Sequence, residues 1–308
     1  MSGNANKKSV VFDSDVLYRD TTEPEVLTLR NKLYGQFSRQ IGLLLESKRP
    51  RKISTTKGRL NSRLAYRYPF TETIFSAYEH TPSSDTTIIM LIDGSGSMDT
   101  YVGDGVNRIQ ASNAICSAFA MAVDRVLGNE LKFEVFLKSA PGVIADQLGT
   151  KGSFLCLSRV LTNSARNRKA NDFDKILRLD TYCPFTIDGN TQGSYTAEYG
   201  VVPALMDWMS SNIETKNAII FNLTDGETYA VVGSRDSGYM LRNQETKELR
   251  NKYMRGIPNF TMLIGRDLGE KESRAVYGDN VIVSKDNVED MTGKLFSTLM
   301  SMLDSSLE

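Results

Sequence analysis

The chain has 308 residues, and its 37 Lys and Arg balance 37 Asp and Glu, so the formal net charge is zero. Proteins dedicated to nucleic acids or anionic membrane surfaces usually carry a basic excess, so this balance argues against both classes. Hydrophobic residues make up 40% of the chain, which excludes a wholly disordered protein and permits one large domain or two small ones.

Three cysteines and one histidine limit the chemistry further. Cys116, Cys156 and Cys183 are too far apart for a disulfide framework and form no CxxC pair. They predict reduced thiols and a cytoplasmic protein. The lone His80 excludes a zinc site made of several histidines and restricts Ser-His-Asp catalysis to that one residue. No apolar run reaches the roughly 18 residues that a membrane span requires.

The first 84 residues predict an arm, a helix and a basic connecting segment. Residues 1–23 are polar and lack a periodic pattern, so we expect a mobile or extended arm. From Glu25 to Glu46, apolar residues recur every three or four positions, which predicts an amphipathic helix. Residues 47–68 contain eight basic residues and no acidic ones. This segment predicts either a solvated linker or a docking surface for an acidic partner or nucleic acid.

Residues 85–308 alternate between strand and helix patterns. This alternation predicts an α/β domain of Rossmann-like type, with a doubly wound, mostly parallel sheet and helices on both faces. The runs at 86–92 and 218–223 are continuously apolar, as expected for strands that are buried on both faces. Further strands are expected at 131–137, 154–157, 260–264 and 281–283, and further helices at 105–127, 196–212, 244–253 and 287–303. The strand at 154–157 is expected to pair with the strand at 131–137, and residues 158–180 to form a loop and a helix.

Two loops that follow the apolar strands carry oxygen-bearing side chains. DGSGS at 93–97 follows the first strand, and TDG at 224–226 follows the second. Open α/β sheets bind ligands at the carboxyl ends of their strands, so both loops are expected at one edge of the sheet. Alternate side chains of an extended segment point the same way, which would bring Asp93, Ser95 and Ser97 together. One carboxylate and two hydroxyls suit Mg²⁺, Mn²⁺ or Ca²⁺ better than zinc or copper.

An apolar strand, the loop DGSGSM and a following helix together resemble the von Willebrand factor A domain with its metal-ion-dependent adhesion site. That site combines D-x-S-x-S with a threonine from a later loop and an aspartate after a central strand. The resemblance implies these metal ligands: Asp93, Ser95, Ser97 and Asp225. For the threonine, Thr196 in GSYTAEYG is the first choice and Thr191 in GNTQGS is the alternative, because the family's Gly-Gly-Thr sequence is absent.

A second resemblance covers about residues 55–305. KGRLNSRLAYRYPF followed by TPSSDTTIIMLIDGSGSM is similar to the entry into the A domain of the CobT-type subunit of aerobic cobaltochelatase. The N-terminal helix has no counterpart there, and that family's long acidic linker is missing. The CobT-type subunit works with an AAA+ ATPase ring and a third, metal-inserting subunit. Short CobT-like chains also occur in large bacterial viruses.

These observations predict a non-enzymatic, metal-dependent protein-interaction module. A cation at the sheet edge would bind an acidic side chain of a partner, which the resemblance implies is an AAA+ ATPase or its client. The N-terminal helix and the basic segment would form a second docking surface. Two alternatives stay open: a subunit of a cobaltochelatase-like complex, and a structural or scaffolding protein, for example of a viral particle, with an architectural metal. The P-loop sequence GxxxxGK[ST] is absent, so we expect no nucleotide hydrolysis by this chain.

Overall fold

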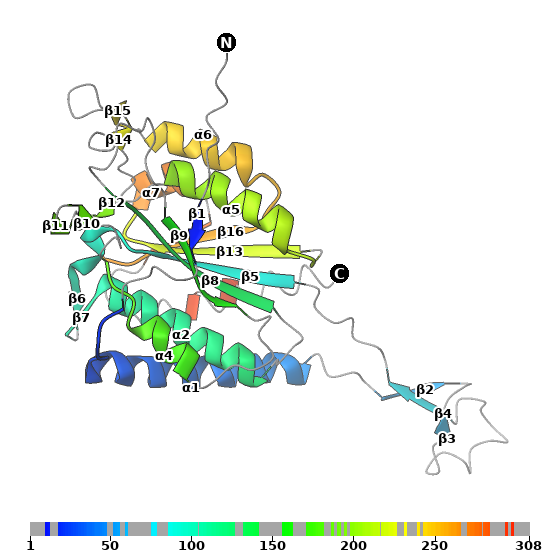
Figure 1. Ribbon diagram of the computed structural model, residues 1–308. Helices are drawn as coiled ribbons and strands as arrows, with labels where there is room; N and C mark the ends of the chain where they lie inside the picture. Colours follow the sequence, from blue (N-terminus) through cyan, green and yellow to red (C-terminus); the bar gives the residue numbers. More distant parts are fainter. Residues whose placement is uncertain are drawn as a thin grey trace.

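A central β-sheet runs through the protein and carries helices on both faces (Figure 1). The computed structural model describes residues 10–12, 18–47, 52–55, 59–60, 75–78, 86–103, 105–126, 132–141, 156–162, 171–181, 186–187, 190–191, 194–195, 198–215, 217–226, 231–232, 239–240, 243–265, 270–278, 280–283, 293–294 and 297–298. The strands of the central sheet are β1 (Val10–Phe12), β5 (Thr86–Asp93), β8 (Lys132–Pro141), β9 (Cys156–Thr162), β12 (Ser194–Tyr195), β13 (Asn217–Thr224), β16 (Asn259–Leu263) and β17 (Val281–Val283).

The order of these strands shows a reversal of direction beside β5. Across the sheet the order is β1-β9-β8-β5-β13-β16-β17, with β12 beside β8. The run from β8 to β17 is parallel, whereas β9 is antiparallel to β8. The chain passes from β5 to β8 and β9 and then returns to place β13 on the other side of β5. Numbered along the chain from β5, and leaving out the short β12, this is the 3-2-1-4-5-6 order of a Rossmann-like sheet. The predicted doubly wound, mostly parallel α/β fold is confirmed.

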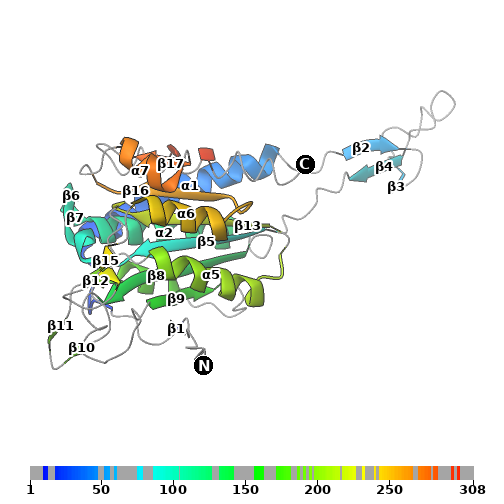
Figure 2. The ribbon, with the colours of Figure 1, turned by 90° about the horizontal axis from the view of Figure 1, so that it is seen from above.

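Helices cover the two faces of the sheet in two groups (Figures 1 and 2). One face carries α1 (Pro24–Ser47), α2 (Arg108–Val126) and α4 (Asn171–Leu177), and the other carries α5 (Glu198–Asn212), α6 (Asn243–Tyr253) and α7 (Glu270–Tyr277). Every residue of β5 is buried, since both of its faces and both of its edges are covered. The continuous apolar run TTIIMLI is the sequence signature of that position. Within the described part of the chain, no helix combines the length and the apolar character of a membrane span.

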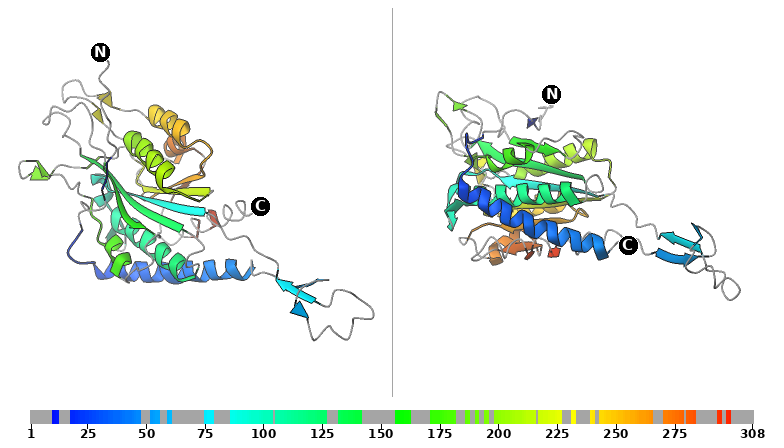
Figure 3. Two further views of the ribbon diagram at one scale, coloured as in Figure 1. Left: turned by 45° about the vertical axis from the view of Figure 1, so that its right-hand side comes forward. Right: turned by 90° about the horizontal axis from the view of Figure 1, so that it is seen from below.

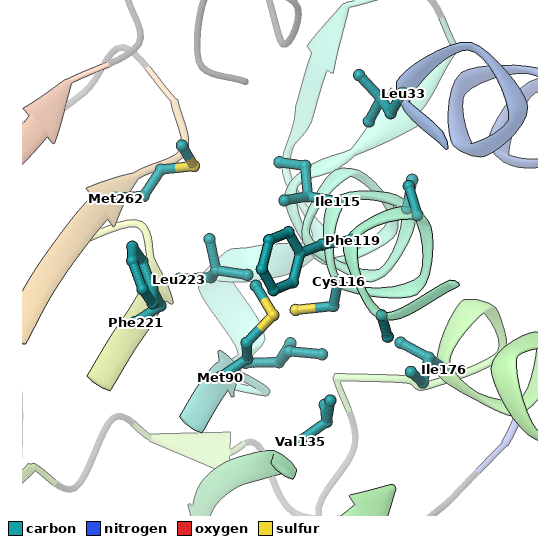
Figure 4. Close-up of a cluster of buried hydrophobic side chains, with 14 of the residues drawn as sticks. Leu33, Met90, Ile115, Cys116, Phe119, Val135, Ile176, Phe221, Leu223 and Met262 are labelled. Atoms are coloured by element: carbon teal, nitrogen blue, oxygen red, sulfur yellow. The ribbon is translucent and has the colours of Figure 1, made fainter. Parts of the chain in front are cut away.

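The larger part of the core lies between the sheet and α2. Figure 4 shows Met90 and Leu223 of the sheet facing Cys116 and Phe119 of α2. All four side chains are buried. Burial raises the pKa of the Cys116 thiol, because the thiolate would lose its hydration. Cys116 is therefore a packing residue of the core.

The N-terminal helix α1 packs against the outer side of α2 (Figure 3). Its buried positions recur at helical spacing and include Leu33 and Phe37, both with no exposed surface. The ring of Phe37 meets the ring of Phe119 edge to face, with centroids 5.6 Å apart. Because α2 lies between α1 and the sheet, nearly all of its residues are buried, including polar ones. The apolar face of α1 is thus occupied within the chain, so a partner docking on α1 meets its polar outer face.

Smaller elements lie outside the central sheet. A separate sheet of strand order β2-β4-β3 stands away from the α/β body in Figure 1. Its strands β2 and β3 belong to the predicted basic segment, and β4 follows that segment. Short antiparallel pairs form between β6 and β7, β10 and β11, and β14 and β15. Their bounds are β2 (Lys52–Thr55), β3 (Arg59–Leu60), β4 (Phe75–Tyr78), β6 (Tyr101–Gly103), β7 (Val106–Asn107), β10 (Thr186–Ile187), β11 (Asn190–Thr191), β14 (Val231–Val232) and β15 (Tyr239–Met240).

Most of the predicted elements of the α/β domain are present, with several differences. The helix expected at 105–127 begins at Arg108, because Val106–Asn107 forms β7. The strand expected at 154–157 is antiparallel to β8 as predicted, but it occupies Cys156–Thr162. The helix α7 is absent from the sequence prediction, because EKESRAVY is short and mostly polar. Residues 1–23, expected as an arm, include β1 at the edge of the sheet. Of the helix expected at 287–303, only 293–294 and 297–298 are described, and they are helical.

Candidate functional site

The two predicted loops meet at the carboxyl edge of the sheet. Asp93 is the last residue of β5, and Asp225 directly follows β13. The two strands are parallel neighbours, with Ile92 in register with Leu223. Both carboxylate side chains are buried. The site therefore lies where the strand order reverses, which is the usual ligand position in doubly wound sheets.

Hydrogen bonds hold the Asp93 carboxylate between the two loops. Oδ1 accepts the backbone N–H of Ser95 at 2.9 Å, and Oδ2 accepts the hydroxyl of Thr224 at 2.5 Å. The Thr224 hydroxyl in turn accepts the N–H of Gly226 at 3.2 Å. Thr224 thus joins the loop after β5 to the loop after β13. Sequence analysis placed Thr224 in the TDG motif without a role, because its contact with Asp93 depends on how β5 and β13 are aligned.

The two serines of the loop lie side by side. The Oγ atoms of Ser95 and Ser97 are 3.2 Å apart. The sequence pattern suggested an extended loop, but the loop is not extended here. It turns into the short 3₁₀ helix η2 (Gly96–Asp99), with the N–H of Met98 bonded to the carbonyl of Ser95 at 3.0 Å. Met98 is fully buried and fixes the turn in the core. The serine hydroxyls therefore converge through a helical turn.

A buried lysine contacts the first carboxylate. Lys138 on β8 places Nζ 3.5 Å from Oδ2 of Asp93, and only 1% of the lysine side chain is exposed. The two residues are register partners on neighbouring strands, and the N–H of Gly94 bonds the carbonyl of Lys138 at 2.8 Å. Sequence analysis missed Lys138. The signal for it is a lysine directly after the predicted strand 131–137, at the strand end where the site was expected.

A buried arginine contacts the second carboxylate. Arg108, the first residue of α2, places Nη1 3.3 Å from Oδ2 of Asp225 and 3.4 Å from the carbonyl oxygen of Ser97. Gly265, just after β16, makes room for the guanidinium. Its φ is +124°, and a Cβ atom there would lie 2.5 Å from Nε of Arg108. Arg108 was also missed, since nothing in the sequence connects the start of this helix to the TDG loop.

The start of α2 is tied to the DGSGS loop by a second set of polar contacts. Asn107 and Gln110 bond each other reciprocally, with each side-chain oxygen accepting the other residue's N–H at 2.9 Å. The side-chain amide of Asn107 also donates to Asp99 at 2.7 Å. Arg19, which precedes α1, lies 3.7 Å from the same carboxylate. Asp99 is therefore engaged in holding the loop and the N-terminal segment together.

The two threonine candidates are not placed at the site. Thr196 lies outside the described residues. Thr191 belongs to β11, where it pairs with Thr186 of β10, and its side chain is also outside the description. The threonine ligand that the family resemblance implies thus remains a prediction.

The site offers ligand atoms of the type that hard divalent cations bind. The described part of the site offers the carboxylates of Asp93 and Asp225 and the hydroxyls of Ser95 and Ser97, all of them oxygen. The residues that the structure describes contain no cluster of three or more His, Cys, Asp or Glu, as expected for a site built from two carboxylates and hydroxyls. Oxygen ligands of this type suit Mg²⁺, Mn²⁺ or Ca²⁺.

Comparison with known proteins gives likeness to solved structures alone. No protein-family model and no curated protein matches the chain. The adhesive tip pilin GBS104 from Group B Streptococcus agalactiae is 12% identical over 70% of this chain and 99% of its own, with a TM-score of 0.43. The pilus adhesin SpaC from Lactobacillus rhamnosus GG is 15% identical over 72% of this chain and 30% of its own, with a TM-score of 0.46.

A third similar structure is proximal thread matrix protein 1 from the mussel byssus, which was solved with a zinc-occupied MIDAS motif. It is 16% identical over 72% of this chain and 47% of its own, with a TM-score of 0.37. The chain thus spans less than half of the length of this protein and of SpaC. At these identities and TM-scores, neither a family nor a function follows from the likeness.

Proposed function

We propose that the protein is a metal-dependent interaction module of the von Willebrand factor A type. The observation that carries this proposal is the meeting of Asp93, Ser95 and Ser97 with Asp225 at the carboxyl edge of β5 and β13. Asp93, Ser95, Ser97 and Asp225 would hold Mg²⁺, Mn²⁺ or Ca²⁺, with Thr196 as the expected threonine ligand. The bound cation supplies positive charge that attracts an acidic side chain of another protein.

The chain's own residues prepare the site for such a contact. The Ser95 N–H and the Thr224 hydroxyl orient the Asp93 carboxylate, and Arg108 orients the Asp225 carboxylate. The buried surroundings strengthen electrostatic attraction, because water screens it less there than at the surface. The proposed partner is an AAA+ ATPase or its client in the cytoplasm, and this part is supported by the CobT-type sequence resemblance alone.

An affinity capture with a matched pair of serine variants tests the function. The bait is the full chain in lysate of its native host, with Mg²⁺ or with EDTA. Ser97→Ala removes one hydroxyl from the site, and Ser210→Ala removes an exposed hydroxyl from α5 as the control. We expect an AAA+ ATPase with wild type and Ser210→Ala in Mg²⁺, and its loss with Ser97→Ala or EDTA. Recovery of the same proteins in every sample contradicts the proposal.

A structural or scaffolding role is the second candidate. The observation that favours it is that both carboxylates of the site already contact buried cations of the chain, at 3.5 Å and 3.3 Å. A cluster of this kind can hold loops together without exchanging partners. Assembly into particles that EDTA does not disturb would support this role. Co-recovery of a large chelatase subunit with the AAA+ ATPase would instead support the cobaltochelatase-like complex.

A further inference from the structure

Among the residues that the structure describes, the candidate metal site pairs two buried carboxylates with two buried cations. Lys138 faces Asp93, and Arg108 faces Asp225. The side chains of all four residues are at most 5% exposed. The formal charges of these four side chains sum to zero before any metal binds. A divalent cation would therefore raise the charge of a buried cluster by two, which is costly away from water.

We propose that Lys138 is a built-in counter-cation of Asp93 that competes with the divalent cation for this carboxylate. This inference rests on the proposed metal-dependent function. It adds that Lys138 regulates how tightly the site binds the metal. The wild-type protein binds the metal weakly, because the ammonium group of Lys138 must first leave Asp93. An incoming acidic side chain favours the exchange, since it offsets the added positive charge.

The contacts of Asp93 show why the two cations compete. Oδ2 receives the Thr224 hydroxyl at 2.5 Å and faces Nζ of Lys138 at 3.5 Å. This oxygen therefore accepts one hydrogen bond and lies in the electrostatic field of the Lys138 ammonium group. Metal–oxygen bonds of Mg²⁺ and Ca²⁺ are about 2.0–2.6 Å long, so an ion bound to Oδ2 would lie within about 6 Å of an ammonium that is 3.5 Å from the same oxygen. Repulsion between them is strong in a poorly screened site.

The backbone around Lys138 cannot shift to relieve that repulsion. Asp93 and Lys138 are register partners, and the Gly94 N–H bonds the Lys138 carbonyl at 2.8 Å. A Cβ atom at Gly94 would lie 3.1 Å from the side chain of Leu137, so the loop already sits tightly against β8. The exchange must therefore occur through the flexible four-carbon stem of the lysine.

Arg108 differs from Lys138 in how it is held. Its guanidinium contacts both Asp225 and the carbonyl of Ser97, and it lies against Gly265, where even a Cβ atom would collide with it. A planar group held from several sides keeps its position better than an ammonium on a flexible stem. The geometry therefore identifies Lys138 as the cation that moves and Arg108 as the one that stays.

Titration of the full chain with Mn²⁺ in an isothermal calorimeter tests this inference. The variant is Lys138→Met, and the matched control is Lys132→Met on the same strand, whose lysine is 50% exposed and 3.7 Å from Glu214. We expect Lys138→Met to bind Mn²⁺ about tenfold more tightly than wild type, because removing one buried like charge favours the ion. Lys132→Met should bind as wild type does. Equal or weaker binding by Lys138→Met overturns the inference.

Thermal unfolding of the same proteins gives a second measurement. Without metal, Lys138→Met leaves Asp93 without its cation, so its Tm in EDTA should fall by several degrees. Mn²⁺ should restore most of that loss, and it should raise the Tm of wild type less. If Lys138→Met does not fold in EDTA, folding that depends on Mn²⁺ is the expected result. A variant that Mn²⁺ fails to restore overturns the inference.

Ser97→Ala separates failure of this inference from failure of the proposed function. If wild type and Lys138→Met bind Mn²⁺ equally and Ser97→Ala binds less, the site stands and the role of Lys138 is wrong. If none of these proteins binds Mn²⁺, the metal-dependent function fails together with the inference.

Discussion

The two regions that hold α2 in place differ in the kind of contact they use. At the start of the helix, Arg108 contacts Asp225 and the carbonyl oxygen of Ser97, and its guanidinium packs closely against Gly265. Along its middle, α2 packs between the sheet and α1 through apolar side chains such as Phe119, which meets Phe37 at 5.6 Å. The first region depends on a few buried charges, and the second on many small apolar contacts.

This difference predicts how each region responds to substitution. A buried ion pair adds little stability over an apolar pair of the same size, but losing one partner leaves an uncompensated charge. An apolar interface loses stability in proportion to the volume removed, because the surroundings relax only partly. Single substitutions should therefore lower stability most at the start of α2. Replacing both partners of a contact by apolar residues should recover stability only at that ion pair.

The largest expected effect is at the ion pair. Arg108→Met should lower the free energy of unfolding by about 4 kcal/mol, because it leaves the Asp225 carboxylate buried without its cation. Arg108→Met combined with Asp225→Leu should recover most of this loss. Urea unfolding of the single and double variants measures both values. A double variant that is as unstable as the two single variants added together would contradict the comparison.

The next largest effect is expected at the interface between α1 and α2. Phe37→Ala should cost about 3 kcal/mol, since it removes a fully buried ring from contact with Phe119. Leu43→Ala is the matched control on the same helix, because Leu43 is 57% exposed, and it should change stability by less than about 0.5 kcal/mol. Equal losses for the two variants in urea unfolding would show that α1 does not pack as described.

A smaller effect is expected where Gly265 faces Arg108. Gly265→Ala should cost about 2 kcal/mol, since φ is +124° and the added methyl group would meet the guanidinium. Part of this loss comes from the collision and part from the backbone. Gly265→Ala should therefore cost less in an Arg108→Met background, where the rigid guanidinium is absent. An unchanged cost in that background would assign the whole effect to the backbone.

The smallest effect is expected in the labelling of Cys116 in the native protein. Burial raises the pKa of its thiol, and the thiolate is the reactive form, so native protein should resist alkylation. In a variant with Cys156→Ser and Cys183→Ser, iodoacetamide should label Cys116 in urea and leave it largely unlabelled without urea. Mass spectrometry measures the labelled fraction. Rapid labelling of the native variant would show that the core beside α2 opens readily.

The sequence by itself determined the central strands and the two aspartates at their ends. A parallel strand that is covered on both faces must be apolar along its length, and this requirement made 86–92 and 218–223 visible in the sequence. Strands of one parallel sheet end at the same edge, so the strand pattern was enough to place Asp93 and Asp225 together. The amphipathic helix at 25–46 was visible for a similar reason, since one of its faces is buried.

Only the tertiary structure decided which groups surround those aspartates. Lys138 reaches Asp93 because β8 lies beside β5 in one register, and a shift of one residue would turn its side chain to the other face of the sheet. Arg108 and Asp225 are 117 positions apart and meet because α2 starts over the end of β13. The sequence pattern shows which residues are buried, but it does not show which buried charges face each other. That pairing follows from the alignment of elements distant in the chain.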